Sequence, residues 1–180
     1  MKYTKNLIAY FSKRGENYFG GKMVDLPVGN TEVAAKKIQG LAGGDLFEIQ
    51  PALDYPYSYS QTVERAKQEL QQDARPAIVP MKQGVGAYDT IYLGYPNWCG
   101  TMPMPVFTFL ESYDFFGKTV IPFCTHEGSG LGRSESDIKT LCPGATVLNG
   151  LAVRGGDVGL AENDLLDWIQ NINKIKQLEE

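Results

Sequence analysis

The sequence contains few cysteines and only one histidine. Its three cysteines are Cys99, Cys124 and Cys142, and its histidine is His126. The cysteines form no CxxC pair and are odd in number, so neither a disulfide framework nor a zinc site is indicated. Low cysteine use without disulfides favours a reducing cytoplasm. A serine hydrolase with a Ser-His-Asp triad would have to use His126.

Long apolar runs and an excess of positive charge are also absent. No stretch approaches the 18 apolar residues of a membrane span, and the polar segment Met1 to Lys5 begins no signal peptide. The 17 basic and 21 acidic residues give a formal charge of -4. This charge argues against nucleic acid as the main partner, because binding to a phosphate backbone needs a basic face. It is compatible with an acidic surface that docks a basic protein.

The motifs of dinucleotide and triphosphate binding are missing as well. The chain has no GxGxxG fingerprint and no GKS or GKT of a P-loop. It has instead an apolar run from Leu7 to Phe11, a polar loop from Ser12 to Asn17, and a helix start at Gly29-Asn30-Thr31. Free N–H groups at a helix N-terminus bind phosphate. We therefore predict that this loop holds one terminal phosphate and not a pyrophosphate.

Strand and helix patterns alternate along the whole chain, which predicts one domain over residues 1–180. Apolar residues predict strands at 7–11, 46–49, 90–95, 119–125 and 146–153. The alternation within 46–49 predicts a position at or near the edge of the sheet. Helical spacing predicts helices at 31–42, 61–73, from Pro103, at 134–141 and at 162–172, the last burying Leu165, Leu166, Ile169 and Ile172. This alternation is typical of an α/β fold with a five-stranded parallel sheet and helices on both faces.

Two later loops have unusual composition. Pro96-Asn97-Trp98-Cys99-Gly100 places a large aromatic ring in a loop, where it can stack on a flat ligand or pack against its own loop. Thr125 to Gly130 is rich in glycine, which lets backbone N–H groups approach a heterocycle closely, although such a sequence is also common in flexible turns. We interpret His126, in this loop, as a residue that lines the site without transferring a proton.

Together, the loop after the first strand and the segments 94–100 and 124–130 resemble those of a flavodoxin with an insertion in its phosphate loop. The resemblance covers residues 6–172 and implies a three-layer flavodoxin-like fold of strand order 2-1-3-4-5 that binds FMN. It implies that three loops converge at the carboxyl ends of the strands. The expected cofactor contacts are Ser12, Lys13, Arg14, Gly15, Asn17, Asn30, Thr31, Pro96, Asn97, Trp98, Cys99, Gly100, Thr125, His126, Glu127, Gly128 and Ser129.

The insertion leaves two points open. Either Asn17 or Asn30 is the amide that faces the phosphate, because Gly29-Asn30-Thr31 resembles the displaced end of the loop. The segment from Asn17 to Val24 contains a Gly-Gly pair and predicts a small hairpin, which acts as a lid or is a plain surface insertion. Tyr55, Tyr57 and Tyr59 are either partners of the ligand ring or, as we favour, local packing.

These features predict an electron-transfer protein that works with a reductase and an acceptor protein. No catalytic residues and no metal ligands are predicted, and the protein is expected to be a monomer or weak dimer in the cytoplasm. The alternative within redox chemistry is an FMN-dependent NAD(P)H:quinone or nitro-type oxidoreductase. From another class, the alternative is a serine hydrolase using Ser12, or a phosphate-binding module, on the same fold.

Overall fold

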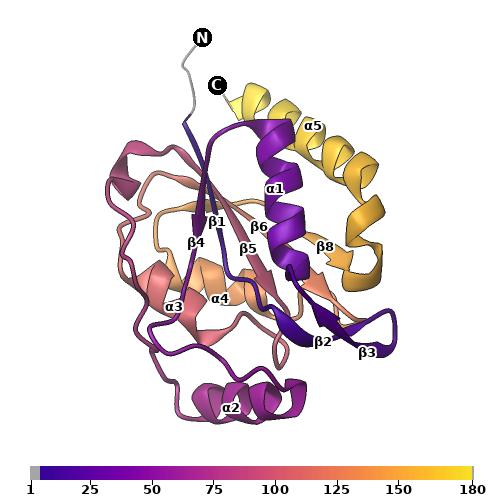
Figure 1. Ribbon diagram of the computed structural model, residues 1–180. Helices are drawn as coiled ribbons and strands as arrows, with labels where there is room; N and C mark the ends of the chain where they lie inside the picture. The colour runs from indigo at the N-terminus through magenta and orange to yellow at the C-terminus, as the bar shows by residue number, and fades with distance from the viewer. Residues whose placement is uncertain (1–4, 180) are drawn as a thin grey trace.

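The structure is a computed structural model that describes residues 5–179, so the expectation for Met1 to Lys5 lies outside it except at Lys5. Figure 1 shows a sheet with helices on both faces. The main sheet contains β1 (Asn6–Tyr10), β4 (Asp45–Glu48), β5 (Thr90–Pro96), β6 (Thr119–His126), β7 (Thr146–Val147) and β8 (Leu151–Arg154). The helices are α1 (Asn30–Ala42), α2 (Tyr59–Gln71), α3 (Met104–Glu111), α4 (Ser134–Leu141) and α5 (Glu162–Glu179).

The strand order agrees with the prediction. The sheet runs β4-β1-β5-β6, with β7 and β8 both paired to β6, and all these pairs are parallel. Counted along the chain, this is the order 2-1-3-4-5 with the fifth strand in two pieces. The order reverses between β1 and β5, where ligand sites form in such sheets.

Side chains of β1 point alternately to two hydrophobic cores. Leu7, Ala9 and Phe11 pack on the side of α3 and α4, whereas Ile8 and Tyr10 pack on the side of α1 and α5. The four residues Leu7 to Tyr10 are at most 5% exposed. Burial on both faces explains why the run is apolar without alternation. The central strand therefore ends in a fixed position, and the loop that follows it is anchored.

The fifth strand departs from the prediction of one continuous strand over 146–153. It is interrupted between β7 and β8, because Pro122 of β6 has no N–H to donate to it. A Cβ on Gly150 would lie 2.9 Å from the Pro122 carbonyl oxygen, and the Gly150 N–H donates instead to Glu135 Oε1 at 2.6 Å. The prediction of a single strand was wrong because the neighbouring strand decides where pairing stops.

Two helix predictions also need correction. Helix α5 continues to Glu179 instead of ending at Ile172, and Leu166 is 36% exposed and so does not join the buried Leu165, Ile169 and Ile172. Helix α2 starts at Tyr59, two residues before the predicted start. None of the helices among residues 5–179 is long and apolar enough to cross a membrane.

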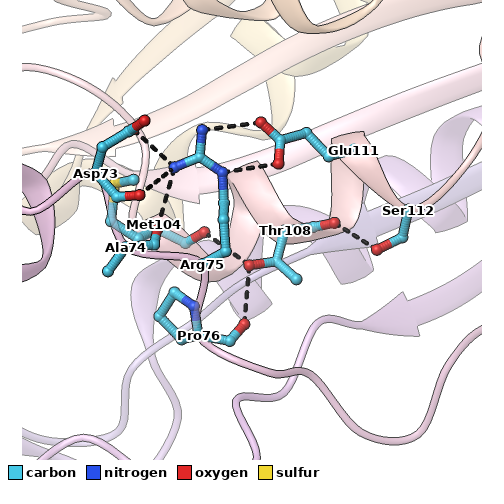
Figure 2. A network of polar contacts seen from close by, with 8 residues as sticks. All are labelled: Asp73, Ala74, Arg75, Pro76, Met104, Thr108, Glu111 and Ser112. Atoms are coloured by element: carbon cyan, nitrogen blue, oxygen red, sulfur yellow. Dashed lines mark hydrogen bonds and ion pairs between the residues drawn. The ribbon is translucent and has the colours of Figure 1, made fainter.

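A polar network attaches the segment after α2 to α3 (Figure 2). The Arg75 guanidinium donates two hydrogen bonds to the Glu111 carboxylate, each 2.8 Å long, and a third to Asp73. Thr108 of α3 donates to the Pro76 carbonyl oxygen at 2.8 Å. The hydrogen bond with Glu111 raises the pKa of Arg75, so the guanidinium stays protonated. The network fixes the chain that leaves α2 against α3.

Candidate functional site

The phosphate loop is interrupted in sequence but continuous in space. An insertion forms the hairpin β2 (Gly15–Phe19) and β3 (Lys22–Leu26), as predicted. A Cβ on Gly29 would lie 2.2 Å from Ser12 Oγ and 2.5 Å from the Lys13 carbonyl oxygen. The chain on the far side of the hairpin therefore closes directly on Ser12 and Lys13.

Ser12 caps helix α1 across this junction. The Glu32 N–H donates to Ser12 Oγ at 3.1 Å, and the Val33 N–H donates to the Gly29 carbonyl oxygen at 3.2 Å. The N–H groups of Asn30 and Thr31 have no acceptor among residues 5–179. These two donors lie at the positive end of the helix dipole, which makes the start of α1 suited to an anion.

The two cations of the loop are engaged by other groups of the protein. Lys13 Nζ donates to the carbonyl oxygens of Arg14, Glu16 and Tyr57 at 3.1 to 3.2 Å, and burial lowers the pKa of Lys13. Arg14 pairs with Glu32 at 3.2 Å and with Glu48 at 3.7 Å. The structure thus places both side chains in the support of the loop, and an anion at α1 would rely on backbone N–H groups and hydroxyls.

Glu32 is compensated although it lies in the first turn of α1. Burial alone would raise the pKa of Glu32, yet hydrogen bonds from Lys36 at 2.8 Å and from Arg14 at 3.2 Å together lower it. The carboxylate is therefore ionised and its charge is paired. It leaves no unpaired negative charge to repel an anion at the helix start.

The three predicted loops converge on one cavity of about 390 Å³ at the carboxyl ends of the strands, which we call the three-loop cavity. Its size is within the usual range for cofactor sites, roughly 300 to 1,000 Å³. The lining residues are Asn17, Tyr18, Asn30, Tyr59, Pro96, Asn97, Trp98, Thr125, His126, Glu127, Gly128 and Ser129. Predicted contacts from all three loops are thus brought together.

Seven predicted residues do not line this cavity: Ser12, Lys13, Arg14, Gly15, Thr31, Cys99 and Gly100. Cys99 and Gly100 lie in the turn after β5, of which Asn97 and Trp98 do line it. Ser12, Lys13, Arg14 and Gly15 line a separate cavity of about 470 Å³ on the β4 side of the phosphate loop. Thr31 is 2% exposed and lies behind the wall, where its hydroxyl and that of Thr125 are 2.8 Å apart. Thr125 therefore contacts both the buried start of α1 and the cavity.

Both candidate amides line the cavity, but they are engaged differently. The Asn17 amide donates to the carbonyl oxygens of Lys13 and Gly15, both at 3.1 Å, and so stabilises its own loop. The Asn30 side chain makes no hydrogen bond with any of residues 5–179. Asn30 is therefore the amide that is available to a ligand.

The loop after β5 holds Trp98 in a tight turn. Trp98 and Thr101 exchange two backbone hydrogen bonds, and the Gly100 N–H donates to Asn97 Oδ1 at 3.0 Å. Trp98 packs edge-on against Phe11 and Tyr55, with ring centroids 5.2 and 4.8 Å away. One side of the Trp98 indole therefore packs against aromatic rings, and another part of it lines the cavity.

The loop after β6 is attached to the loop after β5. Asn97 Nδ2 donates to the Gly130 carbonyl oxygen at 2.7 Å, and the Arg133 N–H donates to the Gly100 carbonyl oxygen at 2.9 Å. Within the loop, the Gly128 N–H donates to His126 Nδ1 at 2.9 Å. His126 is therefore neutral with its hydrogen on Nε2, and it shapes the backbone of the cavity wall.

Glu127 carries a buried oxygen without a partner. Its Oε1 has no hydrogen bond with any group in the described chain. A Cβ on Gly155 would lie 2.6 Å from this oxygen and 2.5 Å from Asn30 Nδ2, so a larger residue there would displace the ends of these two side chains. An unsatisfied carboxylate oxygen at a cavity wall is suited to accept a hydrogen bond from a ligand hydroxyl or N–H group.

Tyr18 and Tyr59 are lining residues that the sequence prediction did not include. Their rings contact each other at 5.5 Å, and the Tyr59 N–H donates to Glu16 Oε2 at 2.7 Å. For Tyr59 the sequence left open a place beside the ligand ring or local packing, with packing favoured; its ring packs against Tyr18 of the hairpin and also lines the cavity. Only the fold of the hairpin onto α2 reveals this position, so no local signal in the sequence could have placed Tyr18 there.

We expect acid to weaken the fold through His126. Burial and then the nearby Arg154 lower the pKa of His126 in the folded protein. The unfolded chain, with a histidine pKa of about 6.5, therefore binds the proton first, so the free energy of unfolding falls as pH drops below about 7. Urea titrations at several pH values measure this. His126→Asn, which keeps an acceptor for the Gly128 N–H, should remove the dependence; an equal slope in that variant would contradict the assignment.

The fold and the cavity define a class: a flavodoxin-like α/β protein whose ligand site lies at the switch point of the sheet. A sequence profile of the flavodoxin family matches residues 5–172, and the chain belongs to that family. A comparison with curated proteins found no match.

Solved structures support this assignment. A protein described as a flavoprotein from Bacteroides uniformis is 32% identical, covers 94% of this chain and 99% of its own, and gives a TM-score of 0.73. One from Bacteroides eggerthii is 30% identical, with 90% and 98% covered and a TM-score of 0.69. A flavoprotein from Lactobacillus acidophilus, solved in complex with FMN, is 23% identical, with 88% and 97% covered and a TM-score of 0.62, and shares the fold.

Proposed function

We propose that this protein binds FMN in the three-loop cavity and transfers electrons between partner proteins. The observation that carries the proposal is the convergence of three loops on a cavity beside the two free N–H groups of α1. FMN, when bound, supplies the one-electron and two-electron chemistry. The residues present fit such a group: Asn30 and the start of α1 suit its phosphate, and Glu127 Oε1 suits a hydroxyl donor.

Each part of the chain has a distinct role in this proposal. The start of α1 and Ser12 hold the phosphate, because they offer hydrogen-bond donors and the positive end of a dipole. Trp98 and Tyr59 provide aromatic surface for the ring. The loop after β6 brings backbone N–H groups to the ring edge. His126, held neutral, adds no charge to this wall.

The direct test is to identify the cofactor of the purified protein. We expect a yellow protein whose heat-released cofactor chromatographs as FMN. Release of FAD, or of nothing that absorbs visible light, would contradict the proposal. Phosphate binding without a chromophore would favour a plain phosphate-binding module.

Ser12→Ala should weaken FMN binding by roughly tenfold to a hundredfold, because a hydrogen bond to a charged group contributes about 1.5 to 3 kcal/mol. The Ser12 hydroxyl accepts from the Glu32 N–H at 3.1 Å, which leaves its proton free for the phosphate. Riboflavin, which lacks the phosphate, should bind the variant almost as it binds wild type. Titrations that follow flavin fluorescence measure both affinities.

Thr31→Ala is the comparison for that experiment. The Thr31 hydroxyl pairs with Thr125 at 2.8 Å, so its loss should act through the wall and weaken FMN and riboflavin by similar factors. Equal losses of FMN and riboflavin in Ser12→Ala as well would mean that Ser12 supports the fold and does not contact the phosphate.

The other candidate functions fit the geometry less well. In a serine hydrolase the Ser12 hydroxyl would have to donate to His126, yet no hydrogen bond joins them, and Ser12 Oγ and His126 Nδ1 each accept a backbone N–H instead. An FMN-dependent oxidoreductase uses the same cofactor site and is distinguished from a carrier by turnover with a small acceptor. Three cysteines without a disulfide among the described residues support a reducing compartment, and we propose the cytoplasm.

A further inference from the structure

A second, smaller cavity adjoins the three-loop cavity. It has a volume of about 250 Å³ and lies between α2 and the turn after β5; we call it the α2 cavity. Asn17, Tyr59, Asn97 and Trp98 line both cavities and form their common wall. The other lining residues are Lys13, Thr62, Val63, Ala66, Lys67 and Cys99. A molecule in the α2 cavity would therefore lie next to whatever fills the three-loop cavity.

Most polar groups of the α2 cavity are already engaged, although the Tyr59 hydroxyl and the Cys99 thiol, like Lys67, make no side-chain hydrogen bond among residues 5–179. Thr62 Oγ1 is 2.9 Å from the carbonyl oxygens of both Pro56 and Ser58, and Lys13 Nζ is held by three carbonyl oxygens. The Asn97 amide bonds to Gly130 through Nδ2 and to Gly100 through Oδ1. These groups offer little to a polar ligand, so the cavity binds through apolar contact and shape.

The remaining surface is apolar, with one cation. Val63 and Ala66 present aliphatic groups from α2, and Trp98 presents an aromatic ring that Phe11 and Tyr55 hold in place. Lys67 is exposed and provides the one lining ammonium group with no hydrogen bond or ion pair among residues 5–179. A ligand that suits this lining is flat and apolar and carries oxygens that only accept hydrogen bonds.

The volume limits the size of that ligand. An apolar cavity of about 150 Å³ holds one benzene ring. A cavity of about 250 Å³ therefore has room for one or two rings but not for a nicotinamide dinucleotide. Its lining also has no cluster of donors for a diphosphate.

We propose that the α2 cavity binds a small planar quinone, which rests on the proposed function because the common wall places it beside the FMN ring. Val63, Ala66 and Trp98 contact the rings, and the Lys67 ammonium donates to a quinone oxygen. This would make the protein able to hold a small electron acceptor in addition to a protein partner.

The test fills the α2 cavity without touching the common wall. Menadione is titrated by calorimetry into FMN-loaded wild type, Val63→Phe and Ala66→Leu, and FMN is titrated separately into each apoprotein. We expect both variants to weaken menadione binding at least tenfold and to leave the FMN affinity within about twofold. Gln68→Leu, a matched control on the exposed face of α2, should bind both molecules as wild type does.

Each result decides the inference. Wild type that does not bind menadione, or filled variants that bind it normally, would overturn it. Equal loss of FMN and menadione in both filled variants would also overturn it, because the α2 cavity would then belong to the cofactor site. If Val63→Phe does not fold, as judged by thermal unfolding, Ala66→Leu decides. Absence of FMN binding in wild type defeats the proposed function alone, and menadione titration of the same protein still tests this cavity.

Discussion

Gly29→Ala is expected to weaken FMN binding by at least about a hundredfold, which corresponds to about 2.7 kcal/mol. The new methyl group would lie 2.2 Å from Ser12 Oγ and 2.5 Å from the Lys13 carbonyl oxygen. The first contact can be relieved by a side-chain rotation, but the second is with backbone and cannot. The two halves of the phosphate loop must therefore separate, and Ser12 loses its contact with the start of α1.

Gly40→Ala is the matched control, because it makes the same chemical change within α1, the helix that Gly29 precedes. No heavy atom lies within 4 Å of its added methyl group, so the variant should gain roughly 0.5 to 1 kcal/mol of stability and bind FMN normally. Fluorescence titration and thermal unfolding measure the two quantities. A Gly29→Ala protein with wild-type FMN affinity would show that the closed loop does not hold the cofactor.

Trp98→Ala is expected to change both the stability and the redox potential. Replacing a fully buried Trp by Ala lowers the free energy of unfolding by about 3 to 5 kcal/mol. Trp98 is half-buried and packs edge-on against Phe11 and Tyr55, so its replacement should lower the free energy of unfolding by about 2 kcal/mol or more. Stacking of the Trp98 indole on the flavin contributes roughly 0.5 to 1.5 kcal/mol and is strongest with the electron-poor oxidised flavin. Its loss should raise the midpoint potential, by up to about 60 mV for one electron.

Trp168→Ala separates the two effects. Trp168 packs against Tyr92 on the opposite face of the sheet, with ring centroids 6.0 Å apart, and does not line the three-loop cavity. It should lose stability without a change in potential or FMN affinity. Dye-coupled titration measures the potentials. If Trp98→Ala also leaves the midpoint potential and the FMN affinity unchanged, the indole does not contact the flavin. Tyr59 then becomes the first candidate for the stacking residue.

The sequence predicts the sheet well because its strands carry their own signal. Leu7 to Tyr10 are buried on both faces, so burial and apolar composition coincide within one short segment. The site could be located from the same logic, since parallel strands bring their following loops to one edge. The cavity unites Asn30, Trp98 and Gly128, which are far apart in the chain.

What the sequence could not predict depends on pairs of distant residues. Arg14 was expected at the phosphate, but Glu32 and Glu48 fold next to it and pair with it. Thr31 was expected to face the ligand, but it meets Thr125, which is 94 positions away. No local pattern specifies such partners, because they are set by how the loops pack in three dimensions.

The interruption of the fifth strand at Pro122 also bears on aggregation. Exposed sheet edges are templates for pairing between chains, and long flat edges are the most hazardous. Here one edge is β4, with 4 residues, and the other is divided into β7, with 2, and β8, with 4. Neither edge offers a long continuous ladder to a second molecule. A proline inside the neighbouring strand thereby keeps this edge of the main sheet short, which disfavours pairing with a second molecule there.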